Sequence, residues 1–241
     1  MKKNPLPAAY SRYGSFDVLG EDNNKRINGI LKELLSGSYA KGSTEQKLSD
    51  LYKLSMDEAR RNKEGVQPLM PLLNKMEKAK TTADLFKIQL ELVPMGDSEF
   101  IGTYVAADEK NAKQNILYVA QSGITLRQKE YYLDTDSATT AIREAYKKHI
   151  VNMFKKFGFS ESAAQKKMQN IMKLETELAK VSKSNTELRD PEANYHKMTY
   201  AEFNKKYPHI QLEKQLLAAG VNLNYVKDLV VGQPEFVEGA D

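Results

Sequence analysis

Residues 160–181, Ser-Glu-Ser-Ala-Ala-Gln-Lys-Lys-Met-Gln-Asn-Ile-Met-Lys-Leu-Glu-Thr-Glu-Leu-Ala-Lys-Val, decide the fold class of this chain. The spacing of its apolar side chains places them on one face of an α-helix and leaves polar side chains on the other. Ser160 precedes the first turn, where its hydroxyl can accept a hydrogen bond from a free backbone N–H group. The stretch therefore predicts a long amphipathic helix that packs against a core. Its apolar positions recur at intervals of four, three, three, four and three residues: Ala164, Met168, Ile171, Leu174, Leu178 and Val181.

Helical spacing continues on both sides of this stretch. Ser43 with Gln46, and Thr199 with Glu202, have the spacing of a capping box, in which two side chains satisfy free N–H groups at a helix start. Most of the chain is therefore predicted to be helical. The further predicted helices lie near 27–35, 43–59, 68–76, 81–92, 142–157 and 199–207.

One part of the chain has a different period. Residues 100–105 and 116–121 alternate with period two and are rich in Ile, Val and Tyr, and the linker at 107–113 is polar. This pattern predicts two short antiparallel strands. The tail from Val226 onward is predicted to be extended. The fold class that follows is mainly α, a multi-helix lobe with one small antiparallel β-hairpin near 99–121.

The first twenty residues are set apart from this lobe. Pro5 and Pro7, followed by Gly14 and Gly20, favour an extended chain with turns over regular structure. We therefore expect two parts, an extended lead over 1–20 and a helical lobe over 21–241.

Composition excludes several classes of protein. The 36 Lys and Arg residues are interleaved with 32 acids, which argues against a dedicated nucleic-acid binder because such proteins gather positive charge on one face. The lysines between Lys147 and Lys173 are better explained as a solvated outer face than as a basic groove. No apolar run approaches the ~20 residues of a membrane-spanning helix. Neither a nucleic-acid partner nor a membrane segment is expected.

Residues that could carry catalysis are hard to find. The chain has no cysteine, and its histidines are His149, His196 and His209. None of them belongs to a His-Glu-x-x-His helix, the usual arrangement for a hydrolytic zinc ion. We therefore predict no catalytic residue, no metal ligand and no cofactor in this chain.

One short segment near the N-terminus is unusual: Tyr-Ser-Arg-Tyr-Gly-Ser-Phe-Asp at 10–17. The guanidinium group of Arg12 can bind a carboxylate through two parallel hydrogen bonds, which lysine cannot do. A simpler interpretation is a local ion pair between Arg12 and Asp17 that stiffens a turn. From the residues alone, this ion pair is the preferred interpretation.

Four motifs, in this order along the chain, resemble the neprilysin and endothelin-converting enzyme family of zinc metallopeptidases. The resemblance runs from about residue 4 to the C-terminus, which makes the set more specific than any one motif. The motifs are Ser-Arg-Tyr-Gly-Ser-Phe-Asp at 11–17, Asp-Glu-Lys-Asn at 108–111 with Gln-Asn-Ile-Leu at 114–117, Gln-Ser-Gly-Ile-Thr-Leu at 121–126 with Tyr-Tyr-Leu at 131–133, and Arg-Asp-Pro at 189–191 with Tyr195, Lys197, Met198 and Thr199.

The resemblance implies a role for the whole chain. Members of this family are zinc endopeptidases with two mainly helical lobes around a closed cavity. One lobe carries His-Glu-x-x-His and a downstream glutamate, and the other covers the cavity and restricts substrates to peptides. By this resemblance, residues 21–241 would be the covering lobe, incomplete at its C-terminus, and zinc would belong to the parent enzyme. The parent would be extracytoplasmic, in a periplasm or at a cell surface.

The same resemblance assigns the candidate site residues. Arg12 matches the arginine that binds the free C-terminal carboxylate of a peptide substrate, and Asp17 matches an acidic residue beside it. Tyr13 and Phe16 are expected to position this turn. Two departures matter: the chain has no Trp, and Leu-Arg-Gln at 126–128 replaces a Leu-Pro turn, so we expect that turn to differ. The absence of the family's cysteines suggests a bacterial member.

The leading hypothesis is therefore an N-terminal fragment of a zinc metalloendopeptidase, inactive by itself. An alternative is a stand-alone helical binding or scaffold module, and a third is nucleic-acid binding through the lysine helices. If helices of the lobe are missing, apolar faces would be left uncovered. We then expect self-association through those faces or disorder near the C-terminus.

Overall fold

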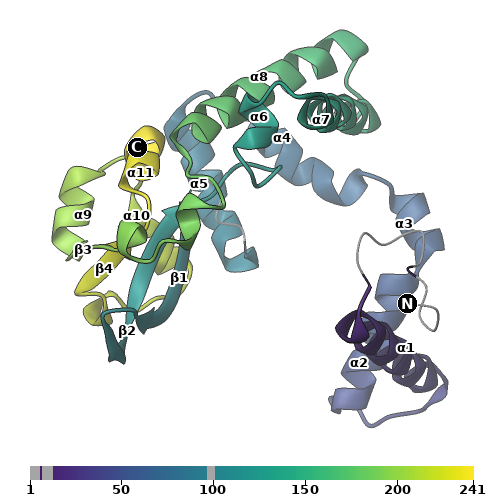
Figure 1. Cartoon of the computed structure of the whole chain (residues 1–241). Coiled ribbons are helices and arrows are strands. Elements are labelled where there is room, and N and C mark those ends of the chain that lie inside the picture. The colour runs from purple at the N-terminus through teal and green to yellow at the C-terminus, as the bar shows by residue number, and fades with distance from the viewer. Residues whose placement is uncertain (1–5, 7–12, 97–100) are drawn as a thin grey trace. The chain divides into compact units, whose positions relative to one another are not determined.

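The computed structural model describes residue 6 and residues 13–96 and 101–241 of the chain (Figure 1). The chain divides into two compact units, Met1–Pro68 and Leu69–Asp241. Most of the described residues are helical, so the prediction of a mainly α fold is confirmed. In the described ranges, every helix is too short or too polar to cross a lipid bilayer.

The first unit consists of α1 (Ser15–Ser36), α2 (Thr44–Met56) and α3 (Glu58–Glu64), and α1 packs against α2. The prediction of an extended lead to residue 20 is wrong from Ser15 onward, because the carboxylate of Asp17 accepts a hydrogen bond from the N–H group of Gly14 and starts α1 there. Ser43 caps α2 as predicted. The helix predicted over 43–59 is two helices, because Asp57 ends α2 and caps α3.

The second unit contains the remaining helices, which follow the predicted pattern with three additions. The predicted caps Ser160 and Thr199 are confirmed, and Thr81 caps the helix predicted over 81–92. The short helices α6, α10 and α11 were not predicted, because each lacks a side-chain N-cap of the kind that marks the equally short α9. The helices are α4 (Met70–Lys78), α5 (Thr82–Leu92), α6 (Glu130–Leu133), α7 (Ser137–Lys156), α8 (Glu161–Val181), α9 (Tyr200–Lys206), α10 (Leu212–Ala218) and α11 (Pro234–Ala240), with 3₁₀ turns at Gln67–Leu69, Val93–Met95, Glu187–Arg189, Glu192–Asn194 and Leu223–Tyr225.

The predicted β-hairpin is part of a four-stranded sheet. Strands β1 (Ile101–Asp108) and β2 (Asn111–Gln121) form the antiparallel hairpin. Strand β4 (Asp228–Val231) pairs with β2 in parallel, and β3 (His196–Thr199) pairs with β4 antiparallel, so the order is β1-β2-β4-β3. The prediction of a single hairpin is therefore incomplete, because β3 and β4 are too short to show a period in the sequence.

The main core lies on one face of this sheet. Leu117 and Val119 of β2 and Leu229 and Val231 of β4 pack there with buried side chains of α8, α9, α10 and α11. The tail is extended only in β4, and α11 follows it. Phe236 of α11 is fully buried, so the expectation of disorder near the C-terminus is wrong. The buried members of this core on these helices are Leu178, Phe203, Leu212, Leu216, Phe236 and Val237, and Tyr207 and Ile210 join them from the segment between α9 and α10.

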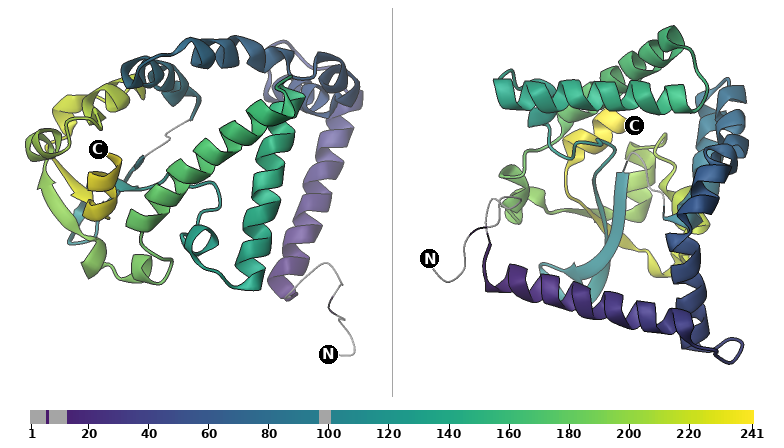
Figure 2. Two further views of the ribbon diagram at one scale, coloured as in Figure 1. Left: turned by 90° about the horizontal axis from the view of Figure 1, so that it is seen from above. Right: turned by 90° about the vertical axis from the view of Figure 1, so that its right-hand side faces the viewer.

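A second core is built from helices alone. Helices α7 and α8 form a hairpin that turns at residues 157–160, and α6 packs against both (Figure 2). Gly158 has a φ of 91° in that turn, a value that favours glycine. The buried members are Tyr132, Ile150, Met172 and Ala179. The amphipathic pattern of residues 160–181 thus marks a helix that contributes to both cores.

Candidate functional site

The structure describes one of the two site residues predicted from the resemblance. Arg12 lies outside the described residues, while Asp17 lies in the first turn of α1. Its Oδ2 atom is 2.7 Å from the backbone nitrogen of Gly14, and the hydroxyl of Tyr13 donates to the carboxylate of Glu21 at 2.8 Å. Phe16 was expected to position this turn, but it is 86% exposed and therefore does not pack against it.

Two of the quoted motifs meet around the carboxylate of Asp108. This side chain is fully buried at the end of β1. Its Oδ1 atom accepts a 2.7 Å hydrogen bond from the hydroxyl of Tyr195 and a 3.0 Å bond from the N–H group of Lys110. Its Oδ2 atom accepts from the side-chain amide of Gln114 at 3.0 Å and from Nζ of Lys197 at 3.3 Å. The structure therefore joins the motif at 108–117 to the motif at 189–199.

This contact also sets the protonation of both partners. The hydrogen bond from Tyr195 is the main cause that holds the pKa of Asp108 well below its usual range, against the opposing effect of burial. Burial, with the neighbouring Asp108 carboxylate, raises the pKa of Tyr195 to about 12. Asp108 is thus an ionised structural residue, and both of its carboxylate oxygens accept hydrogen bonds from donors of this chain.

A second buried carboxylate joins the motif at 121–133 to α7 and α8. Glu175 of α8 accepts hydrogen bonds from the hydroxyls of Thr125 at 2.6 Å, Tyr132 at 2.7 Å and Tyr146 at 3.1 Å. Burial raises the pKa of Tyr146 to about 12. The sequence held a signal for this cluster, because Glu175 occupies the same face of the predicted helix as Ile171 and Leu178.

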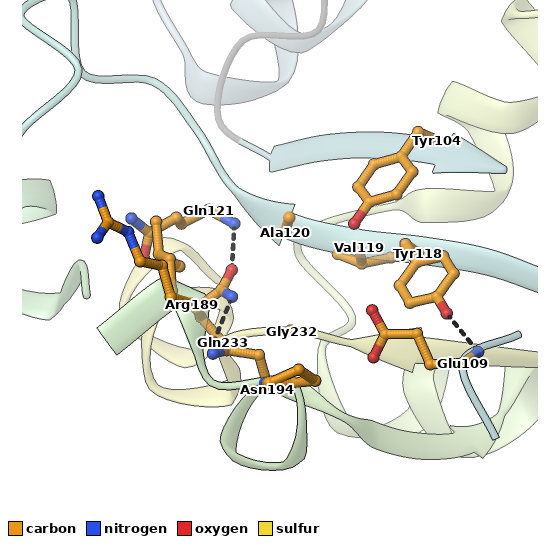
Figure 3. A pocket seen from close by; sticks show the side chains of 12 residues that line it. Tyr104, Glu109, Tyr118, Val119, Ala120, Gln121, Arg189, Asn194, Gly232 and Gln233 are labelled. Carbon is orange, nitrogen blue, oxygen red and sulfur yellow. Dashed lines mark hydrogen bonds between the residues drawn. The ribbon is translucent and has the colours of Figure 1, made fainter. Parts of the chain in front are cut away.

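The motifs also border a hollow beside β2, with a volume of about 310 Å³ (Figure 3). One side is formed by the stacked rings of Tyr104 and Tyr118, whose centroids are 5.1 Å apart. The opposite side is formed by the amide groups of Gln121, Asn194 and Gln233. Figure 3 shows the tyrosines and the amide groups on opposite sides of the hollow.

The amide groups of this hollow are held in place by one another. Oε1 of Gln233 accepts from the N–H group of Gln121 at 2.9 Å, and Nε2 of Gln233 donates to Oδ1 of Asn194 at 2.9 Å. The side chain of Arg189 borders the hollow and has no ion pair among the described residues. Among the residues that line the hollow, no nucleophile adjoins a base.

The three histidines lie on separate elements. His149 is on α7, Nδ1 of His196 is 3.0 Å from the carbonyl oxygen of Val231, and Nδ1 of His209 is 3.2 Å from Oδ2 of Asp241. Within residues 13–96 and 101–241, no group of three or more metal-binding side chains comes together. The described residues therefore do not fit a zinc ion.

Several lysines of α7 and α8 are paired with acids. Nζ of Lys147 is 2.8 Å from Glu144, Nζ of Lys155 is 2.6 Å from Glu161, and Lys167 pairs with Glu77 of α4. These exposed pairs compensate the positive charge locally. They support the interpretation of a solvated face over that of a nucleic-acid groove.

The comparison with protein families gives one match. The family model described as peptidase family M13 matches residues 1–241. Endothelin-converting enzyme 1 from Cavia porcellus and from Homo sapiens is each 33% identical to this chain, over 99% of the chain and 32% of the relative. Neprilysin from Homo sapiens is 23% identical over 98% of the chain and 35% of the relative. The chain spans about a third of the length of these curated relatives.

Solved structures agree in fold. The zinc metalloprotease ZMP1 of Mycobacterium tuberculosis, in complex with an inhibitor, has a TM-score of 0.86 and 27% identity, over 98% of this chain and 36% of that one. PepO from Lactobacillus rhamnosis has a TM-score of 0.78 and 18% identity, over 98% of this chain and 37% of that one. The order of the helices and strands and their fold therefore recur in ZMP1 and in PepO.

Proposed function

Because this chain belongs to peptidase family M13, we propose that it is the covering lobe of a zinc endopeptidase that acts on peptides. The chain spans about a third of its curated relatives, and its described residues do not fit a zinc ion. Zinc and the residues that activate water would therefore be supplied by polypeptide beyond residues 1–241. Residues 21–241 would form a wall of the substrate cavity.

The family match over residues 1–241 carries this proposal. It is supported by the way the quoted motifs are used in the fold. Asp108 accepts a hydrogen bond from Tyr195 at 2.7 Å, and Glu175 accepts one from Thr125 at 2.6 Å, so these motif residues link the elements of the second unit to one another. A unit whose elements are linked by such hydrogen bonds is suited to form part of the wall of a substrate cavity.

The proposed contact between this lobe and a substrate is the guanidinium group of Arg12. Its planar fork would bind the free C-terminal carboxylate of a peptide through two parallel hydrogen bonds. Asp17 would act as a positioning residue, because its carboxylate fixes the N–H group of Gly14 at the start of α1. Peptides with a free C-terminal carboxylate would then be preferred over their amides.

Two further proposals follow from the same reasoning. The parent enzyme would work outside the cytoplasm, which cell fractionation with an antibody to this lobe would test.

Exposed apolar side chains on α1 and α2, such as Ile27, Ile30 and Leu51, would form contact faces through which the isolated chain associates with itself. Light scattering over a range of protein concentrations would test this, and a monomer throughout would contradict it.

The proposed division of labour can be tested by measuring zinc and activity in two polypeptides. The chain of residues 1–241 is expected to bind no equimolar zinc and to cleave no peptide. The longer polypeptide of the same open reading frame is expected to bind one zinc ion and to cleave peptides. Equimolar zinc in the shorter chain, measured by elemental analysis, would contradict the proposal.

A further inference from the structure

Strand β1 has a free edge. It lies at one end of the sheet order, and β2 is its partner on one side. Among the described residues, no other strand pairs with it. The middle of the strand is accessible, since the side chains of Tyr104 and Val105 are 53% and 65% exposed. Unpaired N–H and C=O groups on such an edge are a template for another strand.

Apart from its end, where the register shifts between Ala107 and the buried Asp108, strand β1 lacks the features that usually protect an edge. Residues 101–107 read Ile-Gly-Thr-Tyr-Val-Ala-Ala, without a charged residue or a proline. Proteins commonly shield edge strands with lysine, proline or short length. The opposite edge strand, β3, is four residues long and carries His196 and Lys197. The sheet therefore has one protected edge and one open edge.

Two hollows border this open strand on opposite faces. Successive side chains of a strand point to opposite faces of the sheet, so Tyr104 and Val105 do so. Tyr104 borders the hollow of about 310 Å³ next to Arg189 and Gln233 (Figure 3). Val105 borders a second hollow of about 360 Å³, which is also lined by Tyr225 and Asp228.

We propose that an extended peptide segment binds to β1 as a fifth strand, with its alternate side chains directed toward the two hollows. Main-chain hydrogen bonds would provide affinity, and the hollows would provide preference, as in other cases of strand addition. The proposal rests on the proposed function only in taking a peptide as the ligand.

The lining residues indicate which side chains would fit. On the face of Tyr104, the guanidinium group of Arg189, which has no ion pair among the described residues, favours an acidic side chain on its side of the hollow. The carboxylate of Glu109 disfavours an acidic side chain on the other side, where the ring of Tyr104 favours an aromatic one. On the face of Val105, the exposed ring of Tyr225 favours an apolar side chain. The preferred segment would therefore alternate acidic or aromatic residues with aliphatic ones.

The test uses the chain of residues 1–241 and the peptide acetyl-Lys-Val-Glu-Val-Tyr-Val-Glu-Val-Lys-amide. Hydrogen–deuterium exchange should slow at the amides of β1 when this peptide is added. The same peptide with N-methyl groups on its five central residues should not bind, because those residues can no longer donate main-chain hydrogen bonds to β1. Equal binding of both peptides, or binding without protection of β1, would overturn the proposal.

Two variants of an exposed residue sharpen the test. Val105→Lys places a charge on the edge and should weaken binding by on the order of tenfold or more, measured by calorimetry. Val105→Thr keeps a β-branched side chain and should bind within about twofold of the unaltered chain. Equal affinity of the two variants would count against the edge as the binding site.

Two outcomes separate peptide binding at β1 from carboxylate binding at Arg12 and from self-association through β1. Because the probe ends in an amide, it lacks a free C-terminal carboxylate, the group that Arg12 is proposed to bind, and Arg12→Lys should bind it as the unaltered chain does. Failure at Arg12 and failure at β1 are thus distinguishable. If β1 becomes protected without peptide as the protein concentration rises, a second copy of the chain occupies the edge, and the proposal is wrong.

Discussion

The hydroxyl group of Tyr195 donates a 2.7 Å hydrogen bond to Oδ1 of Asp108, and this bond ties the turn between β1 and β2 to the segment that leads into β3. The two residues are 87 positions apart in the chain. Lys110 strengthens the same junction, because its Nζ atom lies 4.9 Å from the centre of the Tyr195 ring and 2.6 Å from Glu192. The junction lies at the end of β1, where the register with β2 shifts between Ala107 and Asp108.

Removing this hydroxyl should destabilise the second unit. Tyr195→Phe leaves one oxygen of a buried carboxylate with one donor fewer, and a missing hydrogen bond to a buried group is costly. We expect the midpoint of thermal unfolding to fall by a few degrees, roughly 2–4 °C. Tyr225→Phe is the matched control. Because Tyr225 is exposed, this variant should unfold at the same midpoint as the unaltered chain. Equal midpoints for the two variants would contradict the role of the Tyr195 bond.

Asp108 should make the stability of the chain sensitive to acid. Its pKa in the folded chain lies below its ordinary value of 3.8, chiefly because of the hydrogen bond from Tyr195. A lowered folded pKa gives stability that is present above the unfolded pKa and is lost as pH falls through the folded pKa. The free energy of unfolding should therefore decrease below pH 3.8. The decrease should be smaller in Asp108→Asn, and urea unfolding at several pH values would show whether the two slopes differ.

Arg127 has a φ of 61°, a value that proline cannot adopt. Its N–H group also donates to the carbonyl oxygen of Ile124 at 3.1 Å, and proline lacks that donor. This confirms the expectation that the turn differs from a Leu-Pro turn. Arg127→Pro should destabilise the chain by about 3 kcal/mol or more, while Arg127→Gly should relieve about 1 kcal/mol of backbone strain. Urea unfolding would measure both, and a stable Arg127→Pro variant would contradict this geometry.

The hydrogen bonds of Glu175 should matter more than the packing of the neighbouring rings. Tyr132→Phe removes a donor at 2.7 Å from a buried carboxylate and should lower the free energy of unfolding by about 1–3 kcal/mol. Tyr131→Phe is a suitable control, because no hydrogen bond of the Tyr131 hydroxyl occurs among the described residues. Its unfolding free energy should change by less than about 0.5 kcal/mol, and an equal loss in both variants would contradict the role of the buried carboxylate.

Local signals in the sequence were sufficient for most of the helices. Thr199 with Glu202 and Ser160 with its amphipathic stretch act within one or two turns, so their effect is visible in the residues themselves. The start of α1 was not predicted, although its signal in the sequence is also local. Gly14 was interpreted as part of an extended lead, although Asp17 three residues later is the signal of a helix start.

Contacts between distant segments could not be predicted. Strand β4 pairs through Leu229 with Leu117 of β2, and four residues of strand carry no period that reveals such a partner. Asp108 and Tyr195 were both visible in quoted motifs, but their contact depends on the packing of the sheet. Glu175 is the exception, because a charged residue on the apolar face of a predicted helix indicates a buried polar cluster.

The most direct measurement compares cleavage of one peptide and its C-terminal amide by the longer polypeptide. The proposal predicts that Arg12→Lys lowers kcat/KM for the free carboxylate by about tenfold to hundredfold, since two hydrogen bonds between charged groups are lost. Cleavage of the amide should stay unchanged, as should both rates in the control Arg26→Lys. Equal losses on the two peptides, or no loss on either, would contradict the account.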